Sequence, residues 1–443
     1  MTPAGPAAGP AAGPLPLAPR LFAGRSIAAL GIVLIALNLR TAVAGFSPIV
    51  QFVGADIPLS NVSIGVLGMI PPLAFAISGL IAPAVAKRIS LEWALAAACF
   101  AMIIGPLVRA LAPGYPALLV GTAITLAGMG FGNILLPPAV KRYFADRIAL
   151  MTTLYVTLMS VSTALPAFVA VPLADVAGWR VSLGAWGLFA AFAVIPWLIL
   201  AARRARAVAL SRAVVLTGAV GLTGTGDAGL VVSPPDFGLR LLRSRVAWAL
   251  ALLLVSSSAS VYSAFAWFPD VLVDTAGSTE AEAGALLALY ALLGLPIALV
   301  IPSLVARMRN VGWLILASVG FFAAGYAGLI FAPSLAPWLW IVLAGTGPMT
   351  FAITLTLINL RTKTPEASAA VSGFVQAIGY GVGSLGPLIF GLIHTQTQSW
   401  TLPLLFLAAT SLLSLVSAML LAPPRTVEDE LAATRPGAWS FRQ

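Results

Sequence analysis

Long apolar segments recur along the chain from residue 26 to residue 421. A helix needs about 20 apolar residues to cross roughly 30 Å of hydrocarbon, and twelve segments reach that length. Lipid offers no hydrogen bonds to the backbone, so such segments must be helical. We therefore predict transmembrane helices over 26–52, 60–86, 92–111, 115–140, 148–173, 180–202, 246–268, 281–305, 311–332, 337–360, 368–394 and 399–421.

Polar and low-complexity stretches divide these helices into two sets of six. Residues 1–25 are rich in Ala, Gly and Pro, a composition that cannot pack a core. Residues 203–245 contain several arginines and the run TGAVGLTGTGDAG, and we interpret them as a flexible connector. The predicted domains are a disordered tail over 1–25, a bundle over 26–202, the connector over 203–245, a second bundle over 246–421 and a tail over 422–443.

The two sets of helices also repeat each other in sequence. Residues of the first half recur in the second at offsets between 217 and 221, which indicates a duplicated six-helix unit. We predict an all-α membrane protein of two pseudo-symmetric six-helix bundles, with a binding site between them near the bilayer midplane. The matching pairs are Gly65 with Gly284, Pro83 with Pro302, Arg88 with Arg307, Leu126-Ala127-Gly128 with Leu343-Ala344-Gly345, Pro166 with Pro387 and Trp179 with Trp400.

Composition and charge agree with this topology. The chain is 60% hydrophobic and 9% charged, whereas an ordinary soluble domain is about half apolar and about a quarter charged. A net charge of +10 is typical of nucleic-acid-binding domains, but here the positions of the charges exclude that function. With a cytoplasmic N-terminus, alternating helices place 21 of the 24 basic residues on the cytoplasmic side, as the positive-inside rule requires. Both termini are then predicted to be cytoplasmic.

Three arginines depart from that distribution: Arg40, Arg109 and Arg180. We expect Arg109 to extend outward from the end of the third helix and Arg180 to lie at the outer interface. Arg40 is about 14 residues, or roughly 21 Å of helix, from the start of the first segment. A charge at that depth costs about 2.5–3.5 kcal/mol on insertion scales, so it should face a wet cavity or a partner.

The partner of Arg40 is not expected to be a carboxylate, because no Asp or Glu lies in the interior of a predicted helix. The remaining partners are polar groups, backbone carbonyls, water or an anionic substrate, whose planar geometry a guanidinium matches. A purely structural arginine bonded to carbonyls is the alternative. Facilitation, exchange and co-transport with a proton as coupling ion all stay open.

Other polar and aromatic side chains in the predicted helices are candidates to complete a substrate-binding site around Arg40. For each of them, interhelical packing and hydrogen bonding is the alternative. These candidates are Asn38, Asn133, Tyr155, Tyr262, Tyr290, Gln376 and Tyr380. Basic residues at the cytoplasmic helix ends are candidates for gating, namely Lys87, Arg88, Lys141 and Arg142.

The sequence contains few residues that could bind a cofactor or catalyse a reaction. A single cysteine, Cys99, excludes an internal disulfide and a thiolate metal cluster. The one histidine, His394, falls at the outer end of the eleventh helix, where an interfacial role is the simpler interpretation. The chain has no HExxH and no Gly-x-Ser-x-Gly motif. We expect neither a metal, a cofactor nor an enzymatic activity.

Four long motifs are spaced along the membrane region: "ALNLRTAVAGFSPIV", "AGMGFGNILLPPAVKRYFADRIALMTTLY", "AFAWFPDVLVDTAGSTEAEAGALLALYALLGLP" and "SGFVQAIGYGVGSLGPLIFGLIH…SW". They resemble the cyanate/nitroimidazole (CynX/NimT) permeases of the major facilitator superfamily, and the resemblance runs along nearly all of residues 26–421. The resemblance implies the twelve-helix major facilitator fold and substrates such as cyanate or nitroimidazoles. It also implies that the family's first-helix arginine is Arg40, its fourth-helix Lys-Arg pair Lys141 and Arg142, and its eleventh-helix glutamine Gln376.

The chain departs from the family pattern at three places. Thr41 stands where a proline usually follows the first-helix arginine, and Ala291 stands where an amide is common after the eighth-helix aromatic. The loop signature of the broader superfamily is reduced to Gly79 and the basic pair Lys87-Arg88, without its aspartate.

These observations predict an inner-membrane permease that works as a monomer in the lipid bilayer. It would move a small anion, or a small nitro or cyanate-like compound, by alternating access around Arg40. Two alternatives remain: a drug or metabolite efflux permease of the same fold, and a non-transporting membrane sensor. Absence of intramembrane carboxylates disfavours an exporter of cationic drugs.

Overall fold

Twelve helical spans are confirmed by a computed structural model, which describes residues 25–216 and 240–433. The first half comprises α1 (Ser26–Ala36), α2 (Thr41–Ala44), the 3-10 turn η1 (Ser47–Ile49), α3 (Val50–Asp56), α4 (Asn61–Ile89), α5 (Leu91–Ala110), α6 (Tyr115–Tyr143), α7 (Ile148–Ala177) and α8 (Trp179–Leu216). The second comprises α10 (Arg245–Ala276), α11 (Glu280–Leu292), α12 (Gly294–Arg307), α13 (Gly312–Phe331), α14 (Pro337–Thr346), α15 (Met349–Leu360), α16 (Pro365–Gly383), α17 (Leu385–Thr397), α18 (Thr401–Ser411), α19 (Leu413–Leu421) and α20 (Val427–Ala433).

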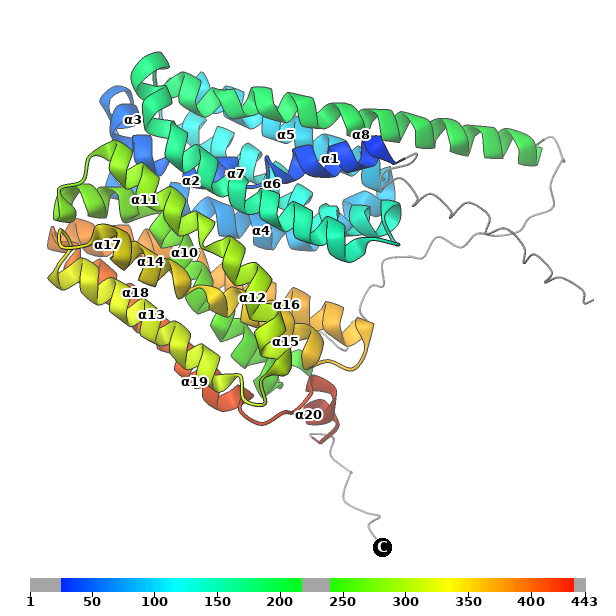
Figure 1. The fold of residues 1–443 in the computed structure, drawn as a ribbon. Coiled ribbons are helices and arrows are strands. Elements are labelled where there is room, and N and C mark those ends of the chain that lie inside the picture. The colour runs from blue at the N-terminus through cyan, green and yellow to red at the C-terminus, as the bar shows by residue number, and fades with distance from the viewer. Residues whose placement is uncertain (1–24, 217–239, 434–443) are drawn as a thin grey trace, which may run out of the picture.

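The halves form two bundles that meet at one end and diverge towards the other (Figure 1). We call the end that carries Asp56, Asp274 and Glu280 the acidic end; α3, α11 and α17 lie there. The opposite end, where α8 and α20 end, carries Arg142 and Lys363 and is called the basic end. The halves therefore contact each other most closely at the acidic end.

Two repeat-related glycines lie in that contact. A Cβ atom at Gly65 of α4 would be 3.1 Å from the carbonyl oxygen of Pro387 in α17. A Cβ atom at Gly284 of α11 would be 2.8 Å from the carbonyl oxygen of Ala167 in α7. Small residues let helix backbones approach this closely in a membrane. The duplicated glycines thus bring the two bundles together at two equivalent places.

A second equivalent pair of contacts stabilises the acidic end within each half. The indole nitrogen of Trp179 donates to Asp56 at 2.9 Å, and that of Trp400 donates to Asp274 at 2.9 Å. The Trp179 indole and the Arg180 guanidinium hold the pKa of the Asp56 carboxyl below its usual value. Both tryptophans belong to the sequence repeat, so the predicted pseudo-symmetry extends to individual hydrogen bonds.

The helices α8 and α10 extend furthest beyond their predicted ranges. The helix α10 continues to Ala276, which places Asp270 and Asp274 inside a helix. The expectation that no acidic residue lies within a helix is therefore wrong, because an acidic residue near an interface does not interrupt helical hydrogen bonding. The helix α8 continues past residue 202 to Leu216, into the predicted connector. Residues 217–239 of that connector, and the tail residues 1–24 and 434–443, lie outside the described part of the chain.

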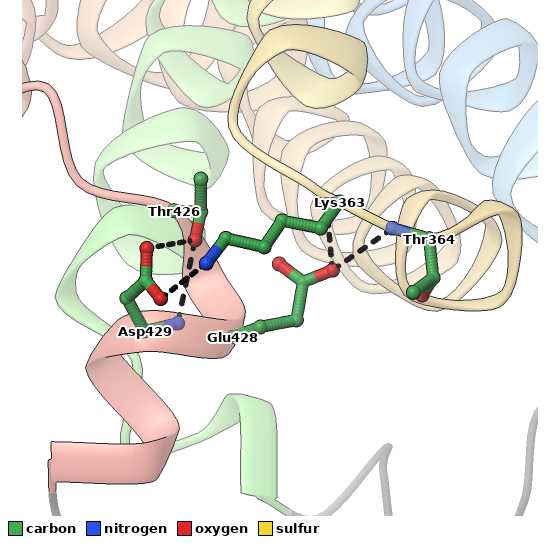
Figure 2. A network of polar contacts seen from close by, with 5 residues as sticks. All are labelled: Lys363, Thr364, Thr426, Glu428 and Asp429. Carbon is green, nitrogen blue, oxygen red and sulfur yellow. Dashed lines mark hydrogen bonds and ion pairs between the residues drawn. The ribbon is translucent and has the colours of Figure 1, made fainter.

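The short helix α20 binds the basic end of the second half. Its Glu430 accepts hydrogen bonds from the backbone N–H groups of Arg245 and Val246, at the start of α10. Its Glu428 accepts from the N–H groups of Lys363 and Thr364, before α16 (Figure 2). Carboxylates are favourable at helix N-termini because unpaired N–H groups point towards them.

An ion pair completes the contact of α20 with the loop before α16. Lys363 binds Asp429, which also accepts a hydrogen bond from the Thr426 hydroxyl at 2.7 Å (Figure 2). These two donors hold the pKa of the Asp429 carboxyl below its usual value. The helix α20 thereby connects the starts of α10 and α16, because its carboxylates accept from the backbone N–H groups at both places.

The closest helix packing within the first half lies between α5 and α6. A Cβ atom at Gly105 would be 2.8 Å from the carbonyl oxygen of Gly121 and 2.5 Å from the backbone nitrogen of Thr125. We predict that Gly105→Ala separates these helices at a cost of about 1–3 kcal/mol, the usual range for overpacking. Thermal unfolding in detergent should show a lower melting temperature.

The matched control is Gly320→Ala, also in a helix interior, where nothing lies within 4 Å of the added carbon. Alanine there should be neutral or raise the melting temperature, since glycine costs a helix roughly 0.5–1 kcal/mol. Equal melting temperatures for the two variants would contradict the packing argument.

Candidate functional site

Arg40 lies at a break in the first membrane span. Residues 37–40 form turns between α1 and α2, and Arg40 precedes α2 with φ −132° and ψ 0°. The Asn38 amide donates to the carbonyl oxygen of Leu34 at 2.8 Å, and the Thr41 hydroxyl donates to that of Asn38 at 3.2 Å. Such side chains offer the backbone alternatives to regular helical bonds. Asn38 therefore acts on the helix break itself.

Three aromatic rings from different helices surround the Arg40 guanidinium. Its central carbon is 4.6 Å from the centroid of the Phe75 ring in α4. One terminal nitrogen donates to the Tyr262 hydroxyl in α10 at 3.3 Å, and the Tyr380 hydroxyl in α16 also interacts with the guanidinium. The ring centroids are 6.2 to 6.4 Å apart, so each ring contacts the other two. We call Phe75, Tyr262 and Tyr380 the aromatic cage.

The aromatic cage joins the two halves of the molecule. Arg40 and Phe75 come from the first half, and the two tyrosines come from the second. All three rings are buried, whereas Arg40 itself remains partly exposed. The guanidinium thus lies at the junction of the bundles, in the position that the duplicated topology predicts for a binding site.

The charge of Arg40 has no carboxylate partner among the side chains that the structure describes. A cation–π contact contributes about 0.5–2 kcal/mol but leaves the positive charge in place. The tyrosine hydroxyls are neutral acceptors. Arg40 therefore keeps an uncompensated charge and donors that an anion can use.

Phe75 is the member of the aromatic cage that the sequence does not reveal. It is one of 21 phenylalanines in a chain rich in apolar segments, and its neighbours carry no polar pattern. Only the packing of α4 against α10 and α16 brings it to Arg40. Tyr262 and Tyr380, by contrast, were predicted from sequence as site candidates.

The other candidates lie at differing distances from this centre. Gln376 donates to Ser372 at 2.7 Å, one turn along α16 from Tyr380. Tyr290 packs against Phe265 and Phe268 with ring centroids 5.8 and 5.6 Å away. Within the described residues, no hydrogen bond joins Asn133, Tyr155, Tyr290 or Gln376 to Arg40.

A wide cavity opens at the basic end, on the same face of α16. Its volume is about 830 Å³, and it is lined by Pro137 of α6 and by residues of the second half, which are polar except for Leu355 and Ile358. Ser368, Ser372, Gln376 and Tyr380 are each four residues apart, so they follow one face of the helix. The two serines line the cavity, and Tyr380 reaches Arg40. A line of polar groups thus leads from the basic end to the guanidinium.

Comparison with known proteins identifies the family. The family model described as Major Facilitator Superfamily matches residues 28–387. The chain belongs to the Major Facilitator Superfamily. It is a multi-pass membrane protein and a transporter of small molecules.

Two curated relatives also confirm the resemblance to the cyanate/nitroimidazole permeases. The "2-nitroimidazole transporter" of Escherichia coli (strain K12) is 31% identical over 391 residues, covering 88% of this chain and 93% of the relative. The "Cyanate transport protein CynX" of the same organism is 24% identical over 405 residues, covering 89% and 97%. A further relative, "Uncharacterized transporter YycB" of Bacillus subtilis (strain 168), is 31% identical over 385 residues, covering 86% and 89%.

Solved structures share the fold of this transporter. A bacterial homolog to the human lysosomal transporter Spinster, in an inward-facing and unoccupied conformation, superposes with a TM-score of 0.70 at 15% identity. The match covers 92% of this chain and 99% of the other. A D-xylose-proton symporter gives a TM-score of 0.65 at 14% identity over 91% and 98% of the two chains. At these identities the likeness concerns the fold alone.

The candidate gating residues of the transporter lie at the basic end. Arg142 pairs with Glu92 of α5 at 3.4 Å, so it binds its own bundle and does not bridge the two halves. Glu92 also accepts from Arg204 at 3.0 Å and from the Tyr143 hydroxyl at 2.7 Å. Arg88 and Lys141 are exposed, and the side chain of Lys87 lies outside the described part of the chain.

Arg109 differs from its prediction. It does not extend to the outer surface but is buried, with 2% of its area exposed. Its guanidinium carbon lies 5.7 Å from the centroid of the Phe46 ring, and its Nε atom has no hydrogen-bond partner. The stem of Arg109 packs on Gly121 of α6, which directs the side chain into the bundle. The hydropathy pattern of the sequence shows that Arg109 lies at the end of a helix, but it does not show which way its side chain points.

The buried Glu92 should stabilise the basic end of the first bundle. We predict that Glu92→Gln lowers the melting temperature of the purified transporter, because hydrogen bonds to charged groups contribute about 1.5–3 kcal/mol and glutamine offers Arg142 and Arg204 one neutral acceptor oxygen in place of a carboxylate. The control is Asp146→Asn, whose pairs with Arg25 and Arg147 are exposed. Exposed pairs are worth about 0–1 kcal/mol, so a larger effect at Asp146 would contradict this assignment.

Proposed function

We propose that this transporter moves a small anion, or a small nitro or cyanate-like compound, across the bacterial inner membrane by alternating access around Arg40. The observation that carries the proposal is the uncompensated guanidinium at the junction of the two bundles. An ionisable residue within a membrane span is by default a functional group. The names of two relatives, a 2-nitroimidazole transporter and a cyanate transport protein, agree with that chemistry.

The aromatic cage suits such a solute in two ways. A planar oxyanion such as nitrate, or a nitro group, can accept two parallel hydrogen bonds from a guanidinium, which a point charge such as lysine does not offer, whereas linear cyanate can accept from it at one end. The hydroxyls of Tyr262 and Tyr380 already lie at the guanidinium and can turn to donate to the bound solute. The Phe75 ring covers the guanidinium from one side and excludes water there. Binding thus exchanges contacts of the Arg40 charge with neutral groups for contacts with a group of opposite charge or high electron density.

The described conformation offers this site to the basic end. The polar face of α16 leads from the wide cavity to Arg40, while the glycine contacts of Gly65 and Gly284 close the acidic end. By the positive-inside rule the basic end is cytoplasmic, so both termini are cytoplasmic and this conformation faces inward. The opposite conformation requires the two glycine contacts to separate and the basic ends to come together. Both glycine contacts are made between helices of the same chain. The transport cycle therefore needs no second copy of the protein.

Flux through proteoliposomes tests the role of Arg40. We expect Arg40→Gln to reduce uptake of the transported solute at least tenfold, because a lost charge-assisted hydrogen bond is worth about 1.5–3 kcal/mol and 1.4 kcal/mol is a factor of ten. The panel of solutes comprises cyanate, nitrate and 2-nitroimidazole, each with and without an imposed pH gradient. Stimulation of flux by the gradient would identify the proton as coupling ion.

The matched control is Arg180→Gln, the same change at an arginine that pairs with Asp56 at the acidic end, away from the cage. It should transport at the wild-type rate. Wild-type flux in Arg40→Gln would overturn the proposed site, and absence of flux for the whole panel in the wild-type protein would overturn the proposed substrate class.

Closure of the acidic end can be tested with one introduced thiol. Ser47 is buried behind the glycine contacts, and Cys99 is buried as well, so a Ser47→Cys protein should react slowly with an impermeant maleimide. Adding Gly284→Val forces the valine against the Ala167 carbonyl, 2.8 Å from the new Cβ atom, and should speed labelling several-fold. Gly294→Val is the control, because nothing lies within 4 Å of its added carbon. Equal rates in both backgrounds would contradict a gate at Gly284.

A further inference from the structure

Arg109 is a second buried cation without a charged partner. It lies in the last turn of α5, and no ion pair among the described side chains includes it. Asp56, an acidic residue of the same half at that end, is engaged by Trp179 and Arg180. The Nε atom of Arg109 is fully buried without a hydrogen bond. Leaving such a donor unpaired costs about 1–3 kcal/mol, and more for a charged group.

A small cavity lies against this guanidinium. Its volume is about 30 Å³, and its lining includes Arg109, Phe46, Ser47 and Thr122 of the first half and Tyr262 of the second. One water molecule needs roughly 10–15 Å³ of such space, so the cavity can hold a small polar guest. Most of the lining is apolar, its polar members are Arg109 and the hydroxyl-bearing side chains of Ser47, Thr122 and Tyr262, and no carboxylate lines the cavity. Its electrostatics therefore favour an anion.

Tyr262 is shared by this cavity and the aromatic cage. The same side chain lines the small cavity and binds the Arg40 guanidinium at 3.3 Å. Phe46 and Ser47, on the cavity wall, follow Arg40 along the first span towards the acidic end. Tyr262 thus contacts Arg40 and also lines the cavity of Arg109, and Arg109, in the last turn of α5, is the arginine nearer the acidic end.

The position of Arg109 is fixed by packing. A Cβ atom at Gly121 would be 2.9 Å from the Cγ atom of Arg109 and 2.8 Å from its backbone nitrogen. This contact with α6 prevents the stem from turning outward to water, which is the usual way for an arginine near a helix end to lower its cost. Because packing keeps the Arg109 charge inside the protein, that charge can be stabilised only by water or by an anion in the cavity.

We propose that Arg109 forms a second anion-binding subsite, in the small cavity on the acidic side of Tyr262, for a small monovalent anion. Its neutral donor is the Tyr262 hydroxyl, whose oxygen accepts from Arg40 and whose proton is free. The hydroxyls of Ser47 and Thr122 donate to the backbone carbonyls of Phe265 and Leu118. When the glycine contacts of the acidic end separate, this cavity becomes the first binding site for an anion that enters from that end towards Arg40. The choice of anion rests on the proposed function, whereas the existence of the subsite rests on Arg109 alone.

Nitrate binding to the purified protein tests the subsite without transport. Nitrate is a small planar monovalent anion that a guanidinium can bind through two parallel hydrogen bonds. Sodium nitrate is titrated against sodium gluconate at constant ionic strength, and the melting temperature is followed by tryptophan fluorescence. A ligand that binds the folded state raises this temperature in a saturable way. The proteins compared are wild type, Arg40→Gln, Arg109→Gln and the double variant.

We expect Arg40→Gln to retain a saturable nitrate-dependent rise, because the Arg109 subsite is intact. In Arg40→Gln/Arg109→Gln that rise should be lost, or its half-saturating nitrate concentration should increase at least tenfold. Arg109→Lys, which keeps the charge but not the planar fork, covers the case in which the glutamine variant fails to fold. In the Arg40→Gln background it should weaken nitrate binding at least threefold, while Arg180→Gln in that background should leave it unchanged.

Loss of the whole nitrate effect in Arg40→Gln alone would overturn the subsite. The subsite would also be overturned if Arg40→Gln/Arg109→Gln, or Arg40→Gln/Arg109→Lys, bound nitrate as tightly as Arg40→Gln alone. Failure of the proposed function has a different signature, since it appears as absent flux in the wild-type protein whatever nitrate does to the melting temperatures.

Discussion

A guanidinium held inside a bilayer has to be wet, paired or bound, and this requirement governs the centre of the transporter. Arg40 is placed by a break in the first span, where Asn38 and Thr41 bond to the backbone of their own helix. No carboxylate meets it within the described residues, and the aromatic cage covers it without neutralising it. The remaining compensation is water from the basic end or an anionic solute, which makes substrate binding part of the stability of the site.

The duplicated architecture brings the two bundles together at the acidic end through two equivalent contacts. Gly65 with Pro387 and Gly284 with Ala167 are equivalent contacts between the halves, made by helices related through the repeat. Both lie at the acidic end, where the two bundles meet. The cage takes two rings from the second half and one from the first, and its geometry therefore depends on how the two bundles are placed relative to each other.

Much of this fold follows from the sequence because lipid imposes helices on every span. The twelve segments, the repeat pairs and the depth of Arg40 are visible as hydropathy and spacing. The end of α10 was placed too early, because Asp270 resembles a loop residue in a hydropathy pattern but is tolerated near a helix end. The same pattern cannot show that α8 continues as a helix to Leu216.

The site itself was only partly predictable, because contacts between distant helices leave no local signature. Tyr262 and Tyr380 could be proposed from their chemistry, but Phe75 is indistinguishable from a lipid-facing phenylalanine until α4 is packed against α16. Arg109 was assigned to the surface because a helix-end arginine usually reaches water. Its burial depends on the close approach of α5 and α6 at Gly121, which cannot be seen in the sequence.

The most direct measurement is an experimental structure of the transporter with a transported solute bound. The account predicts density for the solute within hydrogen-bonding distance of the Arg40 guanidinium, enclosed by Phe75, Tyr262 and Tyr380. Density for the solute elsewhere, with Arg40 still held against Phe75 and Tyr262 as in the empty protein, would contradict the central role of this charge.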